Sequence, residues 1–144
     1  MEKTQKQIEE WTAYRLSVLE QKSKSDEDFE KYITFIAAGA LGLTVTFIDK
    51  ISPLKESVWI WSIIMGWFCL AVTLFVNLYS HYRSSKNNEK AIHDIDENLL
   101  YEVLVENIKK RNKTISRLNL SSIILLGLGI FFILLFTSIN AYNG

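Results

Sequence analysis

The chain has 144 residues, and its sixteen Lys and Arg residues balance sixteen Asp and Glu residues, so the formal net charge is zero. A balanced charge argues against a nucleic-acid-binding protein, and the clustering of apolar residues in long runs argues against a soluble core. The single cysteine, Cys69, excludes an intrachain disulfide, a CxxC pair and a cysteine zinc cluster.

Residues 1–24 are predicted to form a cytoplasmic amphipathic helix. Its narrow apolar stripe is interrupted by Arg15 and consists of Ile8, Trp11, Val18 and Leu19. Such a helix can lie on the membrane surface or dock on other cytoplasmic helices of the same protein. Because its polar face carries both signs of charge, docking is favoured.

A new helix is predicted to start at Ser25, because Asp28 follows three positions later as in a capping box. This helix continues into a first apolar span, residues 32–48, and residues 25–144 as a whole are expected to form a three-span membrane domain. The small and weakly polar residues of the first span recur at helical spacing and form one seam: Gly39, Gly42 and Thr46.

The second span, residues 58–80, is uncharged and long enough to cross a bilayer, with Trp59 and Tyr79 near its two ends. Its small and weakly polar residues form a longer seam: Ser62, Gly66, Cys69, Thr73, then Val76 or Asn77, and Ser80. Membrane helices associate through small residues, so this seam is expected to pack in a bundle or oligomer, or to line a pore. The simplest architecture pairs it with the seam of the first span.

Residues 81–117 are predicted to form a cytoplasmic helical hairpin, with the central helix ending near Ile92 and the next beginning near Asp96, capped by Asp94. Six Lys or Arg residues precede the first span and eight follow the second, against two in the connector 49–57. The positive-inside rule therefore places the N-terminus and the hairpin in the cytoplasm.

The third span, residues 118–141, is uniformly apolar and is expected to face lipid, with Gly127 and Gly129 permitting one close helix crossing. Three crossings from a cytoplasmic N-terminus put the C-terminus outside. The fold class is thus all-α, an integral membrane helical bundle with three transmembrane helices and cytoplasmic helical extensions.

No enzyme motif, cofactor site or metal site is indicated, since phosphate loops and nucleophile elbows are absent and His81 and His93 lack metal-ligand spacing. A basic cluster before the third span serves as a topology anchor, and the alternative is contact with an anionic lipid or a nucleotide ligand. Its members are Lys109, Lys110, Arg111, Lys113 and Arg117.

The passage from about Phe35 to Tyr82 combines a small-residue span, a short loop and a Trp-bearing second span that runs into a charged helix. It resembles small prokaryotic membrane proteins of antiphage and nucleotide-signalling conflict systems, including the SLATT group of two-span effectors. The resemblance implies an oligomeric effector that permeabilises the bacterial inner membrane when a partner or second messenger triggers it. The third span is additional to the two-span plan.

Two functions are therefore expected from different classes. In the first, a homo-oligomer in the bacterial inner membrane forms a pore or disrupts the membrane in antiphage defence, with the seam of the second span packing or lining the oligomer and that of the first span supporting it. In the second, a non-conducting membrane anchor recruits a soluble partner through its cytoplasmic helices. Neither function involves nucleic acid.

Overall fold

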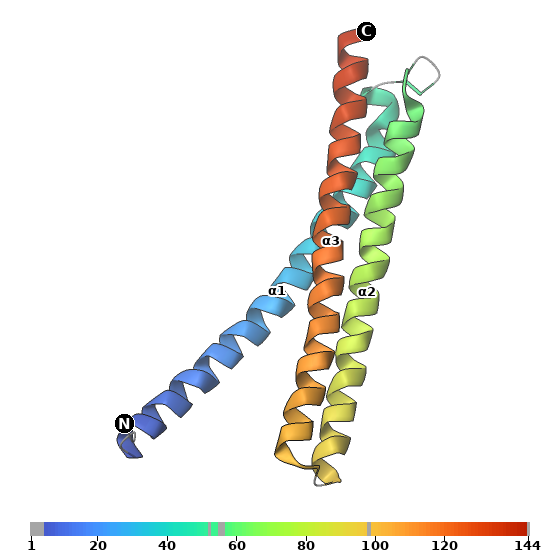
Figure 1. The fold of residues 1–144 in the computed structure, drawn as a ribbon. Helices are drawn as coiled ribbons and strands as arrows, with labels where there is room; N and C mark the ends of the chain where they lie inside the picture. Colours follow the sequence, from blue (N-terminus) through green and yellow to red (C-terminus); the bar gives the residue numbers. More distant parts are fainter. Residues whose placement is uncertain (1–4, 52, 55–56, 98, 144) are drawn as a thin grey trace. The chain divides into compact units, whose positions relative to one another are not determined.

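The computed structural model describes residues 5–51, 53–54, 57–97 and 99–143. Within these residues it contains three α-helices and no strand: α1 (Gln5–Ile51), α2 (Ile60–Asp96) and α3 (Tyr101–Asn143) (Figure 1). The chain divides into two compact units, Met1–Tyr32 and Ile33–Gly144, and the unit boundary falls at the start of the predicted first span. The all-α prediction is confirmed.

Helix α1 runs through Ser25 without a break, so the helix start predicted there is wrong. The acidic residues that suggested a cap instead form ion pairs along the helix, Lys22 with Asp26 and Glu27 with Lys31, each four residues apart. Such pairs between residues four apart lie on one face of a helix and favour a continuous helix here. The hydrogen bond to Glu27 and its negative charge raise the pKa of Lys31.

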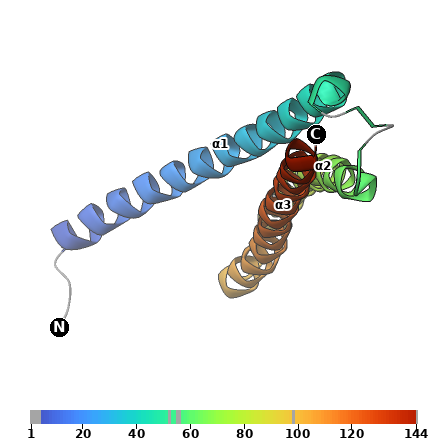
Figure 2. The same cartoon turned by 90° about the horizontal axis from the view of Figure 1, so that it is seen from above.

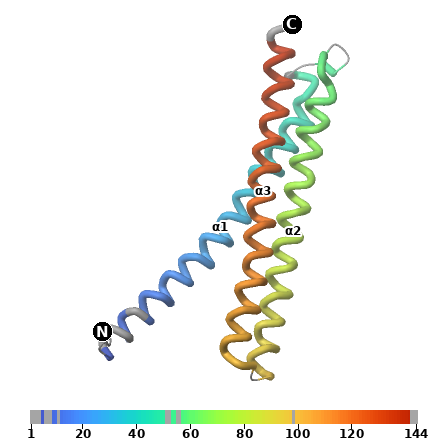
Figure 3. The backbone as a smooth tube through the Cα atoms, in the orientation of Figure 1, coloured from blue at the N-terminus to red at the C-terminus, as the bar shows by residue number. Residues whose placement is uncertain are grey.

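Helices α2 and α3 form an antiparallel hairpin and lie side by side along their lengths, as two perpendicular views show (Figures 1 and 2). In this hairpin α2 continues to Asp96 and α3 begins only at Tyr101, whereas the sequence predicted an end near Ile92 and a start near Asp96. Figure 3 traces α2 and α3 as tubes that run in opposite directions. The helix-start cap predicted at Asp94 is wrong, because this residue lies inside the last turn of α2.

The closest approach of α2 and α3 is a crossing of two glycines. A Cβ on Gly66 would lie 2.8 Å from Ile133 Cγ1 and 3.1 Å from the carbonyl oxygen of Gly129. A Cβ on Gly129 would lie 2.9 Å from Leu70 Cγ and 3.2 Å from the carbonyl oxygen of Gly66. The close crossing expected at Gly129 is confirmed, and its partner is the seam of the second span.

This crossing corrects two expectations. The third span does not simply face lipid, because one of its faces is buried against α2, including Ser122, Leu126 and Phe136. The seam of the first span does not pair with that of the second: among the described residues, no heavy atom outside α1 lies within 4 Å of a Cβ built on Gly39 or Gly42. The longer seam packs against α3, whose glycine permits the backbones to approach.

The membrane part of α1, from Ile33 onward, contacts the hairpin through long side chains. Ile48 packs into a buried cluster with Ile63 and Phe136. Trp67 donates a hydrogen bond from Nε1 to Thr44 Oγ1 at 3.0 Å. Large side chains therefore space α1 from α2, which leaves the glycines of α1 without contacts across the helices.

All three helices are long and apolar enough to cross a membrane, and each is longer than the crossing requires. With 47, 37 and 43 residues, they measure about 70, 55 and 65 Å, against about 30 Å of hydrocarbon. On α2, bulky side chains opposite the packed seam are exposed, as expected of lipid-facing positions: Phe68, Phe75 and Leu78. The chain is a multi-helix candidate membrane protein whose helices extend well beyond their apolar segments.

The glycine crossing predicts unequal effects of glycine-to-alanine substitution. Gly66→Ala should destabilise the protein by about 1–3 kcal/mol, because the new methyl group meets backbone atoms that cannot move alone. Gly42→Ala should be neutral or stabilising by up to about 1 kcal/mol, because its Cβ enters open space in a helix. Thermal unfolding of the purified variants in detergent measures both, and equal midpoints would contradict the crossing.

Candidate functional site

The predicted seam of α2 is buried along its whole length, and α3 contacts it at Ser62, Gly66 and Ser80. Ser62 Oγ donates to the carbonyl oxygen of Phe132 at 3.0 Å, and Ser80 Oγ to Asn119 Oδ1 at 2.9 Å. Gly66 lies at the glycine crossing. The remaining seam residues are also buried: Cys69, Thr73 and Asn77.

Two of these seam residues satisfy their polar groups in other ways. Thr73 Oγ1 donates to the carbonyl oxygen of Cys69 within α2 at 2.8 Å. Asn77 Nδ2 donates to Thr34 Oγ1 of α1 at 2.7 Å. The seam of α2 thus forms an intramolecular packing surface, and its role as an oligomer or pore seam stays a prediction.

The seam of α1 is open in the single chain. Gly42 and Thr46 are exposed and Gly39 is half-buried. The Thr46 hydroxyl donates back to the carbonyl oxygen of Gly42 at 2.7 Å, which leaves a smooth helix surface there. Of the two predicted seams, this one is the surface that remains available for contact with another helix.

At the opposite end of the hairpin from its turn, Asn140 of α3 holds the residue before the α2 N-cap by two hydrogen bonds. Its Oδ1 accepts from Val58 N–H at 2.9 Å, and its Nδ2 donates to the Val58 carbonyl oxygen at 3.0 Å. The adjacent N-cap Trp59 has φ 59° and ψ 36°, a left-handed conformation that is costly for a bulky residue. Asn140 therefore fixes a strained entry into α2.

Sequence reasoning missed Asn140 because a lone amide near the end of an apolar run carries no recognisable spacing. The available signal was that a buried amide in an apolar segment needs partners. Trp59 was predicted as an interfacial aromatic, and it packs beside Trp61 with ring centroids 5.7 Å apart. Both rings are about half exposed.

At the hairpin turn, an ion pair joins α2 to α3. Arg111 Nη2 lies 2.6 Å from Asp94 Oδ2, and Asn107 Nδ2 lies 3.5 Å from the same oxygen. The side chains of Asp94 and Arg111 are only 13% and 18% exposed. Asp94 and Arg111 were predicted as a helix cap and a lipid or ligand contact, but in the structure they hold the hairpin together.

The interior of the hairpin beyond the spans mixes polar and apolar side chains. Its half-buried positions include Arg83, Asn87 and Ala91 on α2 and Leu104 and Thr114 on α3. Among the described atoms, Arg83 Nε and Arg111 Nη1 are buried without a hydrogen-bond partner. The polar side chains and unsatisfied polar atoms imply lower local stability here than in the apolar segments.

The basic cluster is divided by these contacts. Arg111 points into the hairpin, and Lys110 pairs with Glu106 at 2.8 Å on the outside. The Lys110 hydrogen bond and charge lower the pKa of Glu106. The other three members are exposed and form the part of the cluster accessible to an anionic lipid or ligand: Lys109, Lys113 and Arg117.

Apolar side chains cover one outer face near the hairpin turn. Ile92 and Ile95 each directly follow a half-buried residue of α2, and Val105 and Ile108 each directly follow a half-buried residue of α3. In two antiparallel right-handed helices, a residue that directly follows an inward-facing one points to the same side of the pair. We define these four residues together with Tyr101 as the apolar face; Ile92, Ile95 and Tyr101 are 60%, 58% and 72% exposed, Ile108 is 37% exposed, and Val105 is half-buried.

The charge of the hairpin changes along its length. Residues 91–108, nearest the turn, contain five carboxylates and no Lys or Arg: Asp94, Asp96, Glu97, Glu102 and Glu106. Residues 109–117, nearest the third span, contain five basic residues and no carboxylate. The apolar face thus lies in an acidic segment that a basic segment separates from the apolar span.

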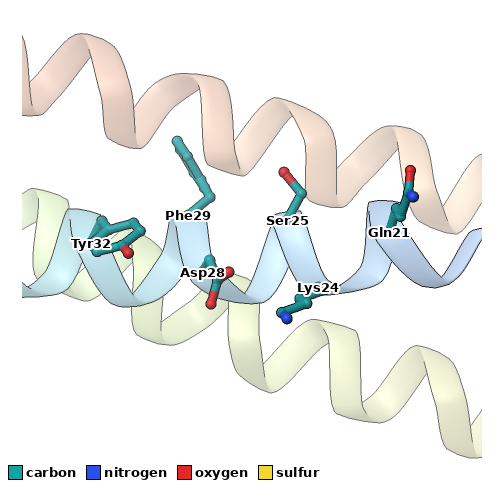
Figure 4. Close-up of a pocket in the computed structure, with 6 residues that line it drawn as sticks. All are labelled: Gln21, Lys24, Ser25, Asp28, Phe29 and Tyr32. Atoms are coloured by element: carbon teal, nitrogen blue, oxygen red, sulfur yellow. The ribbon is translucent and has the colours of Figure 1, made fainter. Parts of the chain in front are cut away.

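In the unit Met1–Tyr32, one shallow hollow runs along α1, lined by Gln21, Lys24, Ser25, Asp28, Phe29 and Tyr32. Gln21, Ser25 and Phe29 point to one side of the helix and Lys24 and Asp28 to another (Figure 4). These side chains do not converge on a ligand position. Among the described residues, no group of His, Cys, Asp and Glu side chains is placed to hold a metal ion.

The apolar stripe predicted for residues 1–24 is tested only in part. The side chains of Ile8 and Trp11 lie outside the described residues. Val18 and Leu19 are exposed, as is Arg15. Whether this stripe meets lipid or other helices stays a prediction.

The Asn140 contact predicts that Asn140→Leu destabilises the protein by about 1–3 kcal/mol, because the N–H and carbonyl groups of Val58 lose their partners. Asn140→Asp should have an intermediate effect, since it retains an acceptor and loses the donor. Ser138→Ala, at an exposed position half a turn away, is the matched control. Thermal unfolding in detergent checks this, and a neutral Asn140→Leu would contradict it.

The ion pair at the hairpin turn predicts that Asp94→Asn leaves Arg111 partly buried without a countercharge. Amide hydrogen exchange over residues 91–108 should then be about tenfold faster or more, while exchange in the apolar segments is unchanged. Asp96→Asn removes an exposed carboxylate of the same turn and should leave the exchange rate close to that of the wild type. Equal exchange in the two variants would refute a locking role for Asp94.

No protein-family model, characterised protein or solved structure matches this chain. Its function is therefore inferred from its own contacts, exposed surfaces and charges.

Proposed function

We propose that this protein is a multi-pass anchor of the bacterial inner membrane that recruits a soluble protein through its hairpin. In this proposal the N-terminus and the hairpin are cytoplasmic, the C-terminus is outside, and the protein has neither catalytic activity nor a cofactor. The observation that carries it is the apolar face, where Ile92, Ile95 and Tyr101 are more than half exposed in a segment too polar to enter the membrane. Exposed apolar patches rimmed by polar residues mark protein interaction sites.

The packing of α2 also favours this function over a pore lined by α2. The seam that would line such a pore is occupied by α3, with two glycines in backbone contact and two serines bonded across the helices. Exposing it would require separation of α2 from α3 and the loss of these contacts. An anchor needs no such rearrangement.

Recruitment is tested in living bacteria with a photo-crosslinking amino acid in place of Tyr101, on the apolar face, or of Lys90, on another face of the hairpin. We expect a soluble protein to be crosslinked from position 101 and not from position 90. The same protein should leave the membrane fraction when Tyr101 and Ile95 are both changed to Ser. Equal crosslinking from the two positions, or membrane retention unaffected by the double variant, would contradict recruitment through this face.

A second function is supported by the open seam of α1, the surface formed by Gly39, Gly42 and Thr46. Small-residue surfaces on membrane helices promote helix association, so this surface fits a second copy of the chain. Together with the resemblance to antiphage effectors, it supports a homo-oligomer that forms a pore or disrupts the membrane in defence. A second messenger or partner, with Lys109, Lys113 and Arg117 as candidate contacts for an anionic ligand or lipid, would be its trigger.

The second function predicts that induced expression depolarises bacteria and that Gly42→Leu abolishes the depolarisation at equal membrane levels. Gly42 is the informative position, because its side chain would enter open space and so should not disturb the single chain. Gly66→Leu is not informative, since it disrupts the α2–α3 crossing whatever the function. Membrane potential and dye entry measure the effect; depolarisation that Gly42→Leu leaves intact would exclude the α1 seam as the assembly surface.

A further inference from the structure

The apolar face of the hairpin lies too far from the predicted membrane border to be a lipid-binding surface. Tyr82, two residues beyond the predicted second span, precedes Ile95 by thirteen residues of continuous helix, or about 20 Å. Ile108 precedes the predicted third span by ten residues, or about 15 Å. Both distances exceed the screening length of about 8 Å at physiological salt.

Charge also opposes a membrane as the occupant. Anionic lipids attract Lys and Arg, whereas the segment 91–108 around the apolar face carries five carboxylates and no Lys or Arg. One carboxylate, Asp94, is paired inside the hairpin with Arg111. The carboxylates near the turn that are exposed would be repelled by an anionic surface: Asp96, Glu97 and Glu102.

A second copy of the chain is a poor occupant of this face as well. Copies of the chain in one membrane have the same orientation, so the acidic segment lies at the same distance from the membrane in each copy. It would therefore meet the acidic segment of the neighbouring copy. Like charges placed opposite each other disfavour such an interface. The basic segment 109–117 that could neutralise it lies closer to the membrane in every copy.

We infer that the apolar face binds a basic amphipathic helix of a soluble protein, with apolar residues along one side and Lys or Arg along its flanks. Two antiparallel helices form a shallow apolar platform of Ile92, Ile95, Tyr101, Val105 and Ile108, on which a third helix can pack as in a three-helix bundle. The exposed carboxylates Asp96 and Glu102 flank this platform. This inference rests on the proposed recruiting function and specifies the chemistry of the partner.

The inference is tested with the full chain in nanodiscs of zwitterionic lipid and two fluorescent peptides of about 18 residues, long enough for five helical turns. One peptide is an amphipathic helix of Leu and Lys, and the other has the same pattern with Glu in place of Lys. We expect the Lys peptide to bind with at least about tenfold higher affinity, and its binding to weaken as salt is raised. Binding should be lost when Ile95 and Tyr101 are both changed to Ser.

A charge reversal separates specific recognition from general adhesion. With Asp96, Glu97 and Glu102 all changed to Lys, the preference should shift to the Glu peptide while the apolar face is retained. A preference for the Lys peptide that survives this change, or that empty nanodiscs reproduce, would overturn the inference in favour of lipid adhesion. Tighter binding of the Glu peptide to the wild-type apolar face would overturn the inference that the partner helix is basic, but it would not contradict the proposed recruiting function.

Other occupants are detected by crosslinking from position 101 in the full chain without peptide. A crosslink to residues 5–31 of the same chain, or to a second copy, would overturn the inference, because the face would then be occupied by this protein itself. Failure of the proposed recruiting function is measured separately, by comparing cellular crosslinking from positions 101 and 90. Failure of the inferred partner chemistry and failure of recruitment are therefore distinguishable.

Discussion

The close crossing of Gly66 and Gly129 is the constraint on which the rest of the hairpin depends. In an apolar solvent, helices gain little by hiding Leu or Ile from lipid, so association relies on close packing and interhelical hydrogen bonds. Two glycines in register let the backbones approach until a Cβ on either would contact the other helix. At that distance, short side chains such as Ser62 and Ser80 can reach groups on α3.

The contacts on either side of the crossing fix the register of the two helices. The Ser80–Asn119 bond lies on one side, and the Ser62–Phe132 and Asn140–Val58 bonds lie on the other. Shifting α3 by one turn would break all three and would place side chains where the glycines now meet. The left-handed Trp59 fits this account, because a strained residue persists only where its surroundings determine its conformation.

The sequence predicted the helices and the buried seam of α2 because helical spacing of small residues is a local property. It predicted the wrong helix as the partner of that seam, because the glycines of the first span looked suitable. The choice depends on long-range packing: Trp67 and Ile48 space α1 from α2, whereas nothing bulky separates Gly129 from Gly66. Similarly, the acidic run at 26–28 resembled a helix cap, but its ion pairs to Lys22 and Lys31 fit a continuous helix equally well.

Beyond the apolar spans, the hairpin has its polar and apolar residues in an unusual distribution. Its interior holds Arg83, Asn87 and the Asp94–Arg111 pair, while Ile92, Ile95 and Tyr101 are exposed outside. A partly polar interior contributes less stability than an apolar one, and the exposed apolar surface near the turn stabilises the protein only when another chain covers it. Both properties favour a segment that is completed by binding, since a third helix on the apolar face would enlarge the small apolar core between the two helices.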